Sequence, residues 1–190
     1  TLKDLNKLKK VLKEKEEWQK LAYLNFTYST GCRREESRQL EKEVAEYEKY
    51  VNLKGEKQNY YVTHNIRAKG KGKQGKIRKF QFDDEAMESI RKWLEVRGED
   101  DCKYLFVTKN KNGETNQVSS STFNTWCNHF GKILDKKVHP HLFRSSRATN
   151  SVVEEGKDIK AVQQLFGHNS SATTELYVIT DNSDDVSELF

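Results

Sequence analysis

Apolar residues recur every three or four positions over most of this chain, which is the spacing of one face of an α-helix. The first such stretch carries the apolar positions Leu2, Leu5, Leu8 and Leu12 among lysines. A second helix is expected from Glu16 to about Tyr28, ending at the turn Ser29-Thr30-Gly31. Later helices are expected over 83–97, 119–133, 145–155, 158–166 and 171–177. The chain should therefore be mainly helical.

Strand-like sequence is confined to short stretches. Residues 59–63 and 76–82 are rich in aromatic and β-branched side chains, and 104–107 could add a short strand. Between the first two lies Lys69-Gly70-Lys71-Gly72-Lys73-Gln74-Gly75, whose glycines suit the tip of a hairpin. Helices without a repeating βαβ order predict an α+β fold with a small antiparallel sheet.

Charge and cysteine content restrict the class of protein. The chain has 34 Lys and Arg against 29 Asp and Glu, a net charge of +5 that suits a polyanionic partner without requiring one. Its 3 cysteines form no Cys-x-x-Cys pair, so a reducing cytoplasm is expected. No apolar run is long enough to cross a bilayer. Because the chain begins without Met, we take it as a portion of a longer protein.

Three groups of residues have the chemistry that breaking a phosphodiester bond requires. Without metal ions, Arg and Lys must hold the charge of the transferring phosphoryl group. The groups are Thr30-Gly31-Cys32-Arg33-Arg34-Glu35-Glu36, His141-Leu142-Phe143-Arg144, and Gly167-His168 with Tyr177 nine residues on. Each has a plainer interpretation: a helix start with surface ion pairs, a partly buried histidine beside a solvated arginine, and a helix cap followed by a core tyrosine.

The order and spacing of these groups resemble the tyrosine recombinase, or phage integrase, family. The similarity runs from about Thr30 to Tyr177, and the leading helix pair is also similar. It implies that Arg33 and Arg144 hold the scissile phosphate, with Glu36 as support. It further implies that His141 and His168 donate to this phosphate and that Tyr177 is the nucleophile. Attack would give a 3′-phosphotyrosyl link without metal, ATP or any other cofactor.

A basic hairpin stands where this family keeps a general-acid lysine. The Gly-Lys-Gly turn matches Lys71, whereas counting back from Lys76-Ile77-Arg78 points to Lys73. We favour Lys71 and keep Lys73 as a supporting residue. The expected DNA contacts are Lys69, Lys71, Lys73, Lys76, Arg78 and Arg147. A solvated surface hairpin is the plainer alternative.

The resemblance also predicts how the protein is organised. Residues 1–190 would be one catalytic domain whose upstream DNA-binding domain lies outside this chain, with residues 178–190 as a tail. The tail has the acidic residues Asp181, Asp184, Asp185 and Glu188, so we expect it to dock on a neighbouring copy rather than beside DNA. The expected partners are double-stranded DNA sites and three further copies of the protein, in a nucleoid of prokaryotic, phage or mobile-element origin.

Other functions remain open from the sequence. An enzyme like a type IB topoisomerase or a telomere resolvase would use similar chemistry, and a DNA-binding module could share the fold without catalysis. A metal-dependent nuclease would need His139, His141 and His168, or Asp83, Asp84 and Glu85, as ligands. We expect no metal, because the histidine spacing matches no familiar zinc pattern and the acids lie at a helix start.

Overall fold

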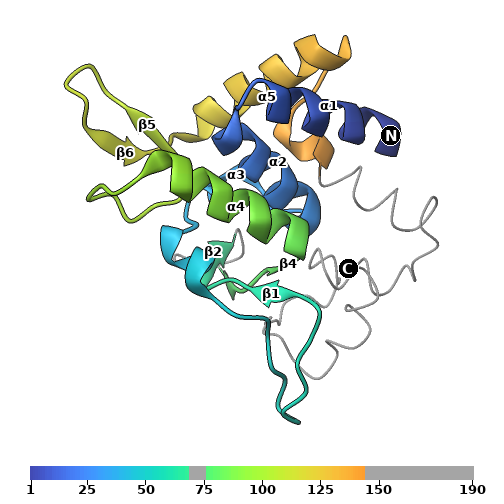
Figure 1. Cartoon of the computed structure of the whole chain (residues 1–190), viewed down its shortest axis with the longest axis vertical. Coiled ribbons are helices and arrows are strands. Elements are labelled where there is room, and N and C mark those ends of the chain that lie inside the picture. Colours follow the sequence, from blue (N-terminus) through green and yellow to red (C-terminus); the bar gives the residue numbers. More distant parts are fainter. Residues whose placement is uncertain (69–75, 144–190) are drawn as a thin grey trace.

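A computed structural model describes residues 1–68 and 76–143 of the chain (Figure 1). Its helices are α1 (Leu2–Glu14), α2 (Trp18–Thr30), α3 (Arg34–Ser37), the 3₁₀ helix η1 (Lys42–Glu46), α4 (Asp84–Arg97) and α5 (Ser120–Leu134). Its strands are β1 (Tyr61–Val62), β2 (Ile66–Ala68), β3 (Lys76–Arg78), β4 (Gln81–Phe82), β5 (Val107–Lys109) and β6 (Thr115–Gln117). The fold is α+β and rich in helix, as the apolar spacing predicts.

Helix α2 lies in the middle of the described structure. It packs against α4, α1 and β4, while α1 and α5 lie side by side on another face (Figure 1). The leucine face of α1 is buried, and Thr1 caps this helix by accepting a hydrogen bond from the Asp4 amide at 3.2 Å. The expected second helix is confirmed, although it begins at Trp18 and continues to Thr30.

Aromatic rings join α2 to α5. The Tyr23 ring stacks on Phe123 with 4.4 Å between centroids, and Phe106 and Trp126 meet both rings edge to face. Removing one such buried ring typically costs about 3–5 kcal/mol of stability. This cluster fixes α2, and therefore the turn that follows it, against the rest of the core.

The predicted hairpin forms, but each arm holds two short strands instead of one. β1 pairs with β4, and β2 pairs with β3, all antiparallel. Between the two pairs, the Thr63 hydroxyl accepts from the Phe80 amide at 2.9 Å, so a side chain takes the place of a ladder bond. The strand expected at 104–107 was misplaced: Tyr104 makes a bridge to Glu41, and β5 begins only at Val107 and pairs with β6.

The two later helices begin at the expected residues. Asp83 caps α4 by accepting from the Ala86 amide at 2.9 Å, whereas Ser119 is the N-cap residue of α5 without a capping bond from its side chain. Among the described residues, no helix is both long and apolar enough to cross a membrane.

Candidate functional site

The turn that carries Arg33 is set by the end of α2. Gly31 ends this helix in the left-handed region at φ 71°, where glycine is favoured over other residues. The Thr30 hydroxyl then donates to the Phe26 carbonyl at 2.8 Å and accepts from the Cys32 amide at 3.1 Å. Arg33 follows in extended conformation as the N-cap of α3, with its side chain 46% exposed.

Glu36 braces Arg33, as the spacing of the first group predicts. One Glu36 carboxylate oxygen accepts from the Arg33 amide at 2.8 Å, and the other lies 4.0 Å from the Arg33 guanidinium. Glu36 itself is only 1% exposed. The carboxylate therefore fixes the backbone of Arg33 from inside the protein and leaves the guanidinium facing solvent.

The His141 turn is anchored by the residue two positions later. A helical turn begins at Pro140, with His141 exposed and Phe143 buried. The Phe143 ring lies 6.3 Å from Tyr23 and 6.1 Å from Phe130, centroid to centroid. The interpretation of His141 as a partly buried histidine is therefore wrong, because the apolar anchoring is done by Phe143 instead.

Tyr23 is a buried residue near both turns. Burial raises the pKa of its phenol well above the usual value, and the nearby Cys127 and Cys32 thiols raise it further. Cys32 directly precedes Arg33, and Phe143 follows His141 by two residues. The buried side chain of Tyr23 thus lies near both the residue that precedes Arg33 and the ring that anchors the His141 turn.

Strand β3 of the basic hairpin places two expected DNA contacts on one face. Lys76 and Arg78 are alternate residues of β3 and are both half-buried, while Ile77 between them is 48% exposed. The Arg78 guanidinium lies 4.4 Å from the Phe80 ring centroid, which holds it close to the sheet. Lys69, Lys71, Lys73, Arg144, Arg147, His168, Tyr177 and the tail lie outside the described residues.

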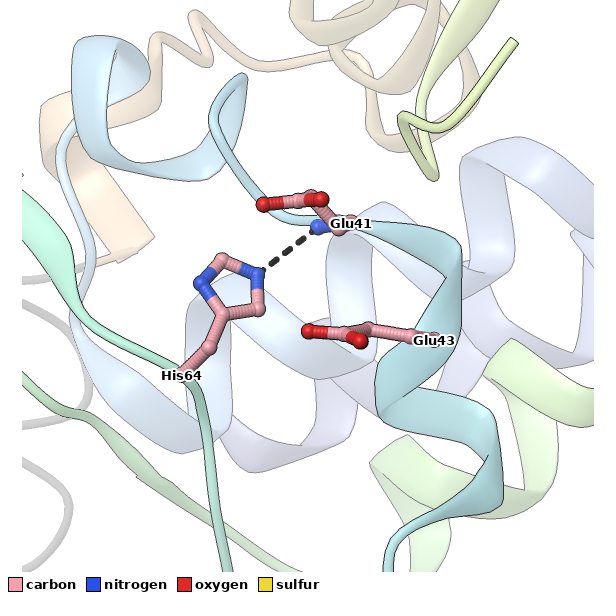
Figure 2. A group of neighbouring side chains, drawn as sticks. All are labelled: Glu41, Glu43 and His64. Atoms are coloured by element: carbon pink, nitrogen blue, oxygen red, sulfur yellow. Dashed lines mark hydrogen bonds between the residues drawn. The ribbon is translucent and has the colours of Figure 1, made fainter.

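Sequence reasoning did not single out His64, which faces Glu41 and Glu43 (Figure 2). Their potential ligand atoms lie within 4.8 Å of one another. However, His64 Nε2 accepts from the Glu41 amide at 3.0 Å, so Nδ1 carries the proton and donates to the Asn65 carbonyl at 3.0 Å. Glu43 accepts from the Tyr47 hydroxyl at 2.8 Å. Both ring nitrogens are used, so His64 ties two segments together and has no lone pair for a metal ion.

The acidic group considered for a nuclease is also used structurally. Asp83 caps α4, Asp84 pairs with Lys49 at 3.1 Å, and Glu85 pairs with Lys9. These carboxylates serve separate partners and do not form a shared ligand set.

Comparisons with known proteins agree with the family that the motifs resemble. A model of the phage integrase family matches residues 1–183. The SPbeta prophage-derived recombinase-like protein YomM of Bacillus subtilis is 31% identical over 193 residues, covering 100% of this chain and 56% of that protein. Tyrosine recombinase XerA of Pyrococcus horikoshii is 35% identical over 126 residues, covering 66% of this chain and 42% of that protein. The chain spans about half the length of the curated relatives it matches.

Solved structures show the same fold. A crystal structure of XerA recombinase matches with a TM-score of 0.67 and 25% identity, covering 100% of this chain and 62% of that one. A structure of XerH site-specific recombinase bound to its difH substrate matches with a TM-score of 0.60 and 20% identity, covering 88% of this chain and 46% of that one.

Proposed function

Because the chain belongs to the phage integrase family of tyrosine recombinases, we propose that it is the catalytic part of an enzyme that cuts and rejoins DNA at specific sites. Its substrate would be double-stranded DNA; a Tn1549 transposon integrase of similar fold is in complex with transposon right end DNA in its solved structure. The proposed location is the nucleoid of a prokaryotic cell, where such DNA resides.

The proposed reaction uses the residues of the three groups. The Tyr177 oxygen attacks the phosphorus, its proton leaves to a base, and the bond from phosphorus to the 5′ oxygen breaks. The 5′ oxygen keeps the bonding electron pair and takes a proton from the hairpin lysine, Lys71 or Lys73. Arg33 and Arg144, with His141 and His168, stabilise the charge on the non-bridging oxygens. Rejoining is the reverse attack by a 5′ hydroxyl, so no ATP or metal is consumed.

The placement of Arg33 carries this proposal. Arginine is not among the residues favoured as helix N-caps, so helix stability does not explain its position in α3. Its guanidinium is almost half exposed, while the carboxylate that braces it is buried. An arginine held by its backbone with its charged end in solvent is poised to bind an anion such as a phosphodiester.

The test is covalent trapping on nicked DNA. The protein, produced over its full natural length, is incubated with a pool of nicked duplexes of randomised sequence, and adducts that survive SDS are isolated. We expect adducts with the natural protein, with and without EDTA, and with the control Tyr104→Phe. We expect none with Tyr177→Phe, and a loss of adducts with much less loss of DNA binding for Arg33→Ala. Adducts with Tyr177→Phe would show that the nucleophile is another residue.

We further propose that four copies assemble on two paired DNA sites, with the acidic tail of one copy docked on the next. The net charge of +5 and the acidic residues between 181 and 190 support this arrangement, since the tail is repelled by DNA and attracted to a basic protein surface.

A further inference from the structure

The side chain of Gln39 joins the end of α3 to strand β2. Its carbonyl oxygen accepts from the Arg67 amide at 2.9 Å, and its Nε2 donates to the Arg67 carbonyl at 2.8 Å. Nε2 also donates to the Glu35 carbonyl at 2.8 Å, one turn back in α3. Both N–H groups of this amide therefore donate, and one of the two lone pairs on its oxygen accepts.

These bonds lie on the free edge of β2. Arg67 is opposite Ile77 in the ladder of β2 and β3. The N–H and C=O of one residue in an antiparallel strand point to the same side, so those of Arg67 point away from β3 and toward Gln39. The Gln39 amide therefore occupies the place that a neighbouring strand would take.

A second contact strengthens the same connection. The Glu41 amide donates to His64 Nε2 at 3.0 Å, three residues before Arg67 (Figure 2). The segment after α3 is therefore attached to the hairpin arm at two points, through Gln39 and through Glu41.

Helix α3 is also held by a second element, strand β6 and the residue after it. The Arg38 side chain donates to the Val118 carbonyl at 3.2 Å and to the Gln117 side chain at 3.3 Å. Gln117 returns a bond from its own Nε2 to the Arg38 carbonyl at 2.8 Å. Gln117 is thus a natural counterpart of Gln39: each is a glutamine amide bonded to backbone, but Gln117 joins α3 to β6 and not to the hairpin.

We propose that Gln39 is a positioning residue that fixes the basic hairpin relative to the Arg33 turn. This inference rests on the proposed function. Arg33 lies six residues before Gln39 at the start of α3, and Lys69 follows Arg67 by two residues. The Gln39 amide therefore connects the element that holds the phosphate to the strand that leads to the proposed general-acid lysine. Its loss should impair proton delivery to the leaving oxygen more than phosphate binding.

The test compares two substrates in single-turnover cleavage by the full-length protein. In one the leaving atom is the normal 5′ oxygen, and in the other it is sulfur. A thiol has a pKa of about 8.5, so a sulfur leaving group departs without a general acid. Gln39→Ala should slow cleavage of the oxygen substrate by about tenfold and leave cleavage of the sulfur substrate near the natural rate. The matched control Gln117→Ala should change both rates by the same factor.

Two further measurements separate the possible failures. Lys71→Ala and Lys73→Ala are the reference, and one of them should show the same selective recovery with sulfur. If neither recovers, the assignment of a hairpin general acid in the proposed function is wrong. If one lysine variant regains the natural rate with sulfur but Gln39→Ala slows cleavage of both substrates by the same factor, the role of Gln39 is overturned while the proposed function stands.

Hydrogen exchange tests the contact directly. The Arg67 amide should exchange faster in Gln39→Ala than in Gln117→Ala, because only the first loses its acceptor. Should Gln39→Ala fail to fold, Gln39→Glu keeps the size and the acceptor but cannot donate to the Arg67 carbonyl, and the same recovery with sulfur is expected. Unchanged exchange at Arg67 in Gln39→Ala would overturn the inference.

Discussion

Asp100 should make the stability of this protein sensitive to acid. Arg97, whose side chain is 3% exposed, donates two hydrogen bonds of 2.6 Å to the Asp100 carboxylate. The Cys102 amide donates a third at 2.9 Å, and Lys42 lies 3.7 Å away. Chiefly through Arg97, and despite partial burial, these contacts lower the pKa of Asp100 from 3.8 to about 2.

This pKa difference corresponds to about 2 kcal/mol, since one pKa unit is worth about 1.4 kcal/mol. The folded-state pKa is below the unfolded value, so the ionised carboxylate stabilises the folded protein. The contribution is complete well above pH 3.8 and is lost as the pH falls through about 2. Asp100→Asn cannot ionise and lacks this contribution at every pH.

The assay is urea unfolding followed by tryptophan fluorescence, at pH values from about 6 to 2. The free energy of unfolding of the natural protein minus that of Asp100→Asn should shrink by about 2 kcal/mol over this range. Asp101→Asn is the matched control, because it removes the same charge from an exposed neighbouring carboxylate. A difference for Asp100→Asn that stays constant with pH would refute the reasoning.

Three other changes test the packing of α5, the Arg33 turn and the proposed docking of the tail. Gly131→Ala in α5 would place a Cβ 2.5 Å from the Lys136 carbonyl oxygen, so it should lower the free energy of unfolding by about 1–3 kcal/mol. At an ordinary helical site the same substitution raises stability, and thermal melting distinguishes the two outcomes. Gly31→Ala should lower the free energy of unfolding in urea by about 1 kcal/mol, because Gly31 has a φ of 71°. It should also slow DNA cleavage by shifting Arg33, and a natural cleavage rate would contradict this. Deleting residues 181–190 should weaken pairing of two DNA sites in a gel-shift assay without weakening single-site binding, and equal pairing would remove the proposed docking of the tail.

Local patterns in the sequence were sufficient for the helices among the described residues; those expected over 145–155, 158–166 and 171–177 lie outside that part of the chain. The leucine spacing of α1, the Asp83 cap of α4 and the glycine after α2 each depend on residues within a few positions of one another. The contact between Arg33 and Glu36 was predictable for the same reason, since the two residues are three positions apart.

Long-range contacts were not readable in this way. Strand β2 was not expected, because Ile66 to Ala68 is short and its pairing with β3 depends on residues on the far side of the hairpin. Likewise, nothing near Gln39 in the sequence indicates Arg67 as its partner, 28 residues away. The apolar stretch that predicted a strand at 104–107 is a local signal, whereas the observed strand begins only at Val107, where the chain pairs with β6.

The predicted arginine of the site therefore depends on tertiary contacts more than on its own helix. Helix α3 has only four residues, and a helix of that length is not stable alone in water. It is held by Glu36 from the inside, by Arg38 toward β6 and by Gln39 toward β2. Losing the Glu36 or the Arg38 contact should tilt the turn of Arg33 without unfolding the core, whereas losing the Gln39 contact should shift β2 and the hairpin. Mutations at these positions should consequently affect DNA cleavage more strongly than they affect stability.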